Sequence, residues 1–178
     1  MSNDSAGTDT RSSSGLKPIA FLDRDGVLNV DIGYLYRPED LVFTPDAEEA
    51  VRWLNEHGVT VVVVTNQSGI GRGLYSVADF EQLMGFMVLE LAEAGAQIDG
   101  YYFCPHLPDS DCECRKPKPG MILDGLRDFG GDPSRSFFIG DKATDMEAAA
   151  AAGVRGVLYS GGSLLAAVRE AAGFLEIA

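Results

Sequence analysis

Two aspartates separated by one residue follow a short apolar run near the start of the chain. Asp23 and Asp25 come directly after residues 19–22, a stretch that predicts a buried strand. Because side chains alternate along a strand, both carboxylates would point to the same side, at the strand end where open α/β sheets bind ligands. Two such charges need a cation or a proton between them. The pair predicts a magnesium site that carries a nucleophile; the alternative is an Asp-Gly turn at Gly26.

A second group of carboxylates follows a later apolar run, residues 136–139. Asp141 comes at the end of this expected strand and is predicted to complete the metal site with Asp23. Lys142 lies between the two carboxylates of this segment. Asp145 would lie one helical turn after Asp141, at the same end of the strand. The alternative for Asp145 is a carboxylate that complements the dipole of the helix N-terminus.

Residues 65–73 combine a hydroxyl with glycines directly after a β-branched run at 59–64. Thr65 and the backbone N–H groups of the glycine-rich part predict hydrogen-bond donors for an anion. A glycine-rich loop is a weak signal alone, and its position directly after an expected strand strengthens it.

All three cysteines of the chain lie within eleven residues, together with one of its two histidines. Cys104, His106, Cys112 and Cys114 provide four ligands, the number that a structural zinc site uses. An odd cysteine count without a secretion signal disfavours a disulfide framework, although a reactive or disulfide-forming Cys112–Cys114 pair stays open. We hypothesise that zinc at this loop would fix the cationic side chains that follow it, Arg115 and Lys116.

The composition excludes some partners. A net charge of −13 argues against nonspecific nucleic-acid binding, which depends on Lys and Arg neutralising phosphates. Six of the 14 basic residues nevertheless fall in the segments that carry chemistry, so a locally positive pocket is predicted, against the alternative of scattered solubilising charges. These six are Arg24, Arg72, Arg115, Lys116, Lys118 and Lys142. No apolar stretch approaches the ~20 residues that span a bilayer, so we expect no membrane partner and a cytoplasmic location.

Strand-like and helix-like segments alternate along the chain. Strands are expected at residues 19–22, 59–64, 101–103, 136–139 and 154–159, and helices at 46–57, 76–95, after Pro119, 144–152 and 164–172. This alternation predicts an α/β protein with a parallel central sheet between two layers of helices. Residues 1–17 are expected to be a disordered tail, and residues 18–178 a single domain that is a monomer.

In order along the chain, these segments resemble the four motifs of the haloacid dehalogenase (HAD) superfamily of phosphotransferases. The matching positions are Asp23-x-Asp25, Thr65, Lys116, and Asp141 with Asp145. The cysteine-histidine loop resembles the zinc-containing branch, which holds heptose 1,7-bisphosphate 7-phosphatases and histidinol-phosphate phosphatases. The resemblance covers nearly all of the chain after residue 17, and it implies a three-layer Rossmann-like fold.

The resemblance implies a magnesium-dependent phosphomonoesterase. By this resemblance Asp23 is the nucleophile that forms an aspartyl-phosphate, and Asp25 is the general acid and base. Magnesium is held by the Asp23 and Asp141 side chains and the Asp25 backbone carbonyl. Thr65 and Lys116 stabilise the transferring phosphoryl group, with Lys142 and Asp145 in support.

The expected substrate is a small phosphorylated sugar. Residues 29–34, 65–73 and 116–121 resemble the heptose bisphosphate branch, whereas the short spacing from His106 to Cys112 resembles the histidinol-phosphate branch. The substrate-binding candidates are Asp31, Gly33, Tyr34, Asn66, Gln67, Ser68, Arg72 and Arg115, with Arg72 or Arg115 available for a second phosphate. The segments before residue 46 and between residues 65 and 116 are too short for a large cap domain. An alternative from another class is a non-catalytic, zinc-stabilised metal-binding module.

Overall fold

Five parallel strands form the centre of the molecule, which a computed structural model describes over residues 15–176. The strands are β1 (Ile19–Leu22), β2 (Thr60–Asn66), β3 (Gly100–Cys104), β4 (Phe137–Gly140) and β5 (Arg155–Leu158). They lie in the order β3-β2-β1-β4-β5, and every neighbouring pair is parallel. The predicted α/β class is therefore confirmed. The strands that lead to Asp23, Thr65 and Asp141 are β1, β2 and β4, which are neighbours at the centre of the sheet.

Helices connect the strands, as the alternating pattern predicted. They are α1 (Ala47–Glu56), α2 (Ser68–Gly71), α3 (Val77–Glu93), α4 (Gly120–Phe129), α5 (Ala143–Ala151) and α6 (Leu164–Ala172), with 3-10 turns η1 (Pro38–Asp40) and η2 (Pro133–Arg135). Ser76 begins α3 with a capping box in which Asp79 is the reciprocal partner, which satisfies backbone groups at the helix start. The short helix α2 was not predicted.

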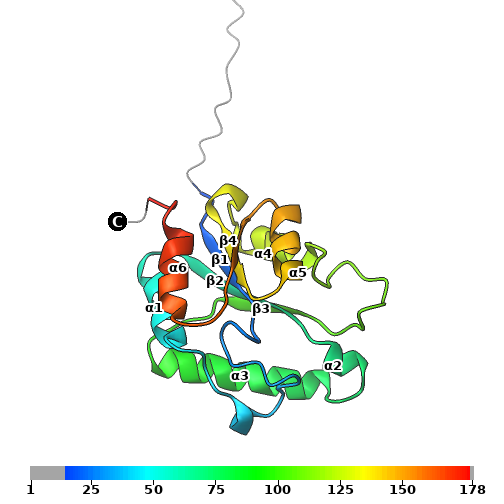
Figure 1. Ribbon diagram of the computed structural model, residues 1–178. Helices are drawn as coiled ribbons and strands as arrows, with labels where there is room; N and C mark the ends of the chain where they lie inside the picture. Colours follow the sequence, from blue (N-terminus) through cyan, green and yellow to red (C-terminus); the bar gives the residue numbers. More distant parts are fainter. Residues whose placement is uncertain (1–14, 177–178) are drawn as a thin grey trace, which may run out of the picture.

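The alternation of side chains in β1 divides the core into two faces. Ala20 and Leu22 pack in a cluster with residues of α1, α3 and α6, whereas Ile19 and Phe21 pack in a second cluster with residues of α4 and α5. Figure 1 shows the corresponding arrangement, with α1 and α6 on one side of the sheet and α4 and α5 on the other. This confirms the predicted three-layer, Rossmann-like HAD fold.

The connections between strands are too short for extra structure over the edge of the sheet where the strands end. The connection from β1 to α1 contains only η1, and the connection from β2 to β3 contains only α2 and α3. Within residues 15–176 there is thus no inserted cap domain, as predicted. In the same range, no helix has the length and apolar character needed to cross a bilayer.

The predicted tail of residues 1–17 lies mostly outside the described residues. Its last residue, Lys17, belongs to the folded part, because its backbone N–H donates to the Gly130 carbonyl at 2.9 Å and its own carbonyl accepts from Asp132 at 2.9 Å.

Gly125 of α4 provides a test of the packing between helix and sheet. A Cβ at this position would lie 2.6 Å from the Phe21 ring, so Gly125→Ala should lower the free energy of unfolding by about 1–3 kcal/mol. Gly85 is a matched control, since it is also helical but has no atom within 4 Å of its added Cβ. Gly85→Ala should be neutral or should stabilise by up to about 1 kcal/mol in denaturant unfolding. Equal effects of the two changes would contradict the packing described here.

Candidate active site

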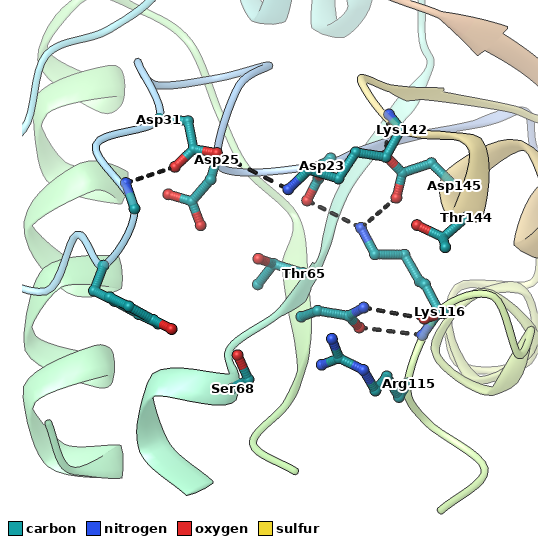
Figure 2. Close-up of a pocket in the computed structure, with 13 residues that line it drawn as sticks. Asp23, Asp25, Asp31, Thr65, Ser68, Arg115, Lys116, Lys142, Thr144 and Asp145 are labelled. Atoms are coloured by element: carbon teal, nitrogen blue, oxygen red, sulfur yellow. Dashed lines mark hydrogen bonds and ion pairs between the residues drawn. The ribbon is translucent and has the colours of Figure 1, made fainter. Parts of the chain in front are cut away.

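A pocket of about 480 Å³ opens where β1, β2 and β4 end. Figure 2 shows its side chains converging from the two sides of the sheet edge. Its lining contains most of the predicted site residues together with Thr144, which the sequence analysis missed because nothing distinguished it from an ordinary residue at a helix start. The lining residues are Asp23, Asp25, Asp31, Gly33, Tyr34, Thr65, Asn66, Ser68, Arg115, Lys116, Lys142, Thr144 and Asp145.

A buried ammonium group lies at the base of the pocket. Lys116 Nζ lies 3.0 Å from Asp23 Oδ1 and 2.7 Å from Asp145 Oδ1, and it donates to the Val64 carbonyl at 3.2 Å. Burial alone would lower the pKa of Lys116, but the two carboxylates raise it, so the amine stays charged. Burial raises the pKa of Asp23 to about 7, against the opposing effect of Lys116. One cation therefore does not compensate the buried carboxylates fully.

Three carboxylates at this point form a group with the dimensions of a metal site. Asp23, Asp141 and Asp145 each offer an oxygen within 4.8 Å of the others. Asp141 Oδ1 is buried and has no hydrogen-bond partner among the described residues, and burial raises the pKa of this carboxyl group. A Cβ at Gly26 would lie 2.3 Å from Asp141 Oδ2, so the glycine leaves the space that Asp141 occupies. An oxygen-rich, under-compensated site of this kind suits a hard divalent cation.

The two aspartates after β1 differ in their surroundings more than the strand pattern predicted. The strand ends at Leu22, and a turn with Gly26 at a φ of +84° follows, so the expected turn is present. Asp25 is absent from the carboxylate group and instead accepts from Arg24 Nη2 at 3.0 Å and from Asn29 Nδ2 at 3.0 Å. The Asp25 carboxylate is therefore held by Arg24 and Asn29, apart from the other three.

Arg24 explains how this carboxylate is held. Its side chain is fully buried, it lies over the Phe80 ring at 5.5 Å, and it also donates to the Leu35 carbonyl at 2.9 Å. Arg24 is one of the six basic residues expected near a positive pocket, but it does not line the pocket. Its position between two aspartates was the available signal for this structural role.

Two predicted substrate-binding residues lie away from the pocket surface. Gln67 is only 2% exposed and donates from Nε2 to Thr65 Oγ1 at 2.8 Å and to Asp25 Oδ2 at 3.0 Å. Arg72 is exposed at the end of α2 and does not line the pocket. Of the two arginines considered for a second phosphate, the structure places Arg115 at the pocket.

Two glycines of residues 69–73, Gly69 and Gly71, allow close packing of neighbouring groups. The backbone N–H groups of residues 70, 72, 73 and 74 donate to carbonyls within the same segment, so these four groups are not available to an anion. A Cβ at Gly69 would lie 2.1 Å from the Tyr75 ring, and one at Gly71 would lie 2.8 Å from the Pro105 carbonyl. The expectation of anion-binding N–H groups is therefore wrong for residues 70, 72 and 73.

Exposed residues form the rim of the pocket. The Gly33 backbone N–H donates to Asp31 Oδ1 at 2.8 Å, and Lys142 Nζ lies 3.9 Å from the other Asp31 oxygen. Tyr34 is exposed and also lines the pocket. The rim thus offers both charges and an aromatic face to a ligand.

The four cysteine and histidine side chains gather beside the pocket. Cys104 Sγ lies 3.8 Å from Cys112 Sγ and 3.4 Å from His106 Nδ1, which lies 3.3 Å from Cys114 Sγ. A tetrahedral zinc ion with Zn–S bonds of about 2.3 Å places two sulfurs about 3.8 Å apart, so the set fits a structural metal. The cysteines are free, with no disulfide among them.

The residues that follow this cluster are anchored unequally. The Lys116 backbone exchanges two hydrogen bonds with the Asn66 amide, at 3.1 and 3.2 Å, in addition to its ion pairs. Arg115 has a single long contact, from Nη1 to the His106 carbonyl at 3.4 Å. The position of Arg115 therefore depends on the cysteine-histidine loop far more than that of Lys116.

Comparison with known proteins agrees with this geometry. A family model described as haloacid dehalogenase-like hydrolase matches residues 18–153. The chain belongs to this family. Among curated relatives, the D-glycero-beta-D-manno-heptose-1,7-bisphosphate 7-phosphatase of Yersinia pestis is 44% identical over 163 residues, which cover 87% of each chain. The enzyme of the same name from Vibrio cholerae serotype O1 is 47% identical over 146 residues, 78% of each chain.

A solved structure shows the same likeness. The D,D-heptose 1,7-bisphosphate phosphatase of B. bronchiseptica, complexed with magnesium and phosphate, is 36% identical, with a TM-score of 0.77 and 86% of both chains covered. The predicted phosphatase of the HAD family is confirmed, and the alternative of a non-catalytic binding module is not retained.

Lys116→Met tests the buried ion pairs without any assay of activity. Removing the ammonium leaves buried carboxylates without their partner, which should lower the free energy of unfolding by about 3–5 kcal/mol. Lys142 is the matched control at the same pocket, because its side chain is 60% exposed and its ion pair with Asp31 is long. Lys142→Met should change the stability by less than about 0.5 kcal/mol. A Lys116→Met protein as stable as wild type would contradict the proposed electrostatics.

Proposed function

We propose that this protein is a magnesium-dependent phosphomonoesterase that removes the 7-phosphate of D-glycero-β-D-manno-heptose 1,7-bisphosphate. The observation that carries the proposal is the arrangement of Asp23 beside Lys116 and the carboxylate group, at the open edge of a fold whose relatives are heptose bisphosphate phosphatases. The solved relative that holds magnesium and phosphate supports the choice of ion and of ligand chemistry.

In this proposal Asp23 and Asp141 hold the magnesium ion through their side chains, and Asp25 holds it through its backbone carbonyl. The ion supplies positive charge that reduces the repulsion between an anionic nucleophile and an anionic phosphoryl group. The buried, unpartnered Asp141 oxygen and the raised pKa of Asp23 support this assignment, since both indicate uncompensated charge.

Asp23 then acts as the nucleophile. Its Oδ1 accepts from the Arg24 backbone N–H at 2.8 Å and from Lys116 Nζ, so we assign the attack on phosphorus to Oδ2. A bond forms between this oxygen and phosphorus while the bond from phosphorus to the sugar oxygen breaks. The product is an aspartyl-phosphate on Asp23 together with the dephosphorylated sugar.

Asp25 moves the protons of both steps. In the first step its protonated carboxyl group gives a proton to the leaving sugar oxygen. In the second step the resulting carboxylate takes a proton from water as the water oxygen attacks phosphorus, which restores Asp23 and releases phosphate. The hydrogen bonds from Arg24 and Asn29 hold this carboxylate at the pocket for both tasks.

The cationic and hydroxyl groups around Asp23 stabilise the transferring phosphoryl oxygens. We assign this role to Lys116 Nζ and the Thr65 hydroxyl, with Asp145 holding Lys116 in place at 2.7 Å. Arg115 is the residue that we assign to the second phosphate, because its guanidinium group lines the pocket. The sugar would contact the rim, for which the candidates are Asp31, Gly33, Tyr34, Asn66, Ser68 and Lys142.

The central test compares two substrates. Phosphate release with magnesium should be at least about tenfold faster, by kcat/KM, from the heptose 1,7-bisphosphate than from histidinol phosphate. Asp23→Asn should abolish release, because the amide is no nucleophile, whereas Asp124→Asn on the exposed face of α4 should leave the rate unchanged. Preference for histidinol phosphate would overturn the substrate and indicate that the short cysteine-histidine loop was the better guide.

The cysteine-histidine loop gives a separate prediction, since we propose that it holds a structural zinc ion. The full-length protein should contain one zinc per chain by elemental analysis, and Cys112→Ser should lose most of it. Because Arg115 depends on this loop, the variant should raise KM for the bisphosphate about tenfold, more than it lowers kcat. Asp111→Ser, at the neighbouring and fully exposed position, is the control that should keep both the zinc and the KM. Full activity in a zinc-free protein would remove this role.

A further inference from the structure

The buried side-chain amide of Gln67 joins residues from the ends of two neighbouring strands, β1 and β2. Its Nε2 donates to Thr65 Oγ1 and to Asp25 Oδ2, at 2.8 and 3.0 Å. Its Oε1 accepts from the Tyr75 hydroxyl at 2.5 Å and lies 3.5 Å from Arg24 Nη2. The amide therefore contacts two residues assigned to the reaction and does not itself reach the pocket.

The direction of this amide follows from the chemistry of its neighbours. The Arg24 guanidinium can only donate a hydrogen bond to it, and Asp25 in its carboxylate form can only accept one. A flipped amide would place its oxygen against the carboxylate and its NH₂ group against the guanidinium. Only one orientation satisfies both ends, and in that orientation the Tyr75 hydroxyl must be the donor.

This orientation determines what the Thr65 hydroxyl can do. A hydroxyl group carries one hydrogen and two acceptor sites. One acceptor site of Thr65 is taken by Gln67, and no hydrogen bond donated by the Thr65 hydroxyl is formed among the described residues. Its hydrogen is thus available to a phosphoryl oxygen in the pocket.

Tyr75 is itself held firmly. Its ring stacks on Tyr36 with centroids 5.1 Å apart and an interplanar angle of 9°, and the residue is 7% exposed. Gly69 leaves the space for this ring, since its added Cβ would lie 2.8 Å from the Tyr75 hydroxyl oxygen. Burial raises the pKa of Tyr75 to about 12, so the hydroxyl keeps its proton.

We propose that Tyr75 and Gln67 are a positioning pair for phosphoryl transfer: the Tyr75 hydroxyl fixes the Gln67 amide, which holds Thr65 and Asp25 in their working orientations. The inference rests on the proposed function, because it assigns the pair a role in that reaction. Since neither residue lines the pocket, the pair should affect turnover and leave substrate binding almost unchanged.

Four variants test the pair by phosphate release from the heptose bisphosphate. Tyr75→Phe keeps the ring and removes the donor, so kcat should fall about tenfold while KM stays within about twofold. Gln67→Met should lower kcat at least as much. The double variant should match Gln67→Met, because Tyr75 acts through Gln67. Tyr36→Phe removes a hydroxyl from the other ring of the stack, and its kcat should equal that of wild type.

Two results would overturn the positioning role: a Tyr75→Phe kcat equal to that of Tyr36→Phe, or losses that multiply in the double variant. If wild type releases no phosphate, the proposed function fails, and a second measurement still tests the pair. The side-chain amide protons of Gln67 should exchange slowly by NMR in wild type and Tyr36→Phe, and faster in Tyr75→Phe. Equal exchange in all three proteins would refute the pair. The same NMR comparison tests the pair in the case that the Gln67→Met protein does not fold.

Discussion

The buried ion pairs of Lys116 are the interaction on which this site depends. The ammonium lies between Asp23 from the end of β1 and Asp145 from the first turn of α5, and it contacts the β2 backbone. One group therefore joins three elements that are distant in sequence. Such a group is stable in a buried position only with its partners present, so the fold and the catalytic arrangement are coupled.

The parallel sheet makes this convergence possible. Because β1, β2 and β4 are neighbours and run in one direction, the residues after each strand meet at one edge. The apolar faces of the sheet are covered by helices, which leaves this edge as the place where polar groups can be exposed to a ligand. The cysteine-histidine loop follows β3 and lies at the same edge of the sheet, and Arg115 and Lys116 come directly after its last cysteine.

The sequence predicted the strands, their parallel arrangement and most of the pocket, since hydrophobic periodicity and the order of the motifs carry that information. It failed where a side chain's role depends on packing. The resemblance of residues 65–73 to the heptose bisphosphate branch predicts that Gln67 binds substrate. In the structure Gln67 is buried and accepts from Tyr75, whose importance no local pattern indicates. Likewise, the glycines of residues 69–73 predict a phosphate loop, although Gly69 and Gly71 allow close packing against Tyr75 and the segment of Pro105. Contacts between distant segments are absent from local patterns.

The most direct test of the account is to trap the covalent intermediate. Acid quenching of the wild-type protein during turnover of the bisphosphate, followed by proteolysis and mass spectrometry, should find one phosphoryl group on Asp23. A phosphoryl group on another residue, or none at any time during turnover, would contradict the central role given to Asp23.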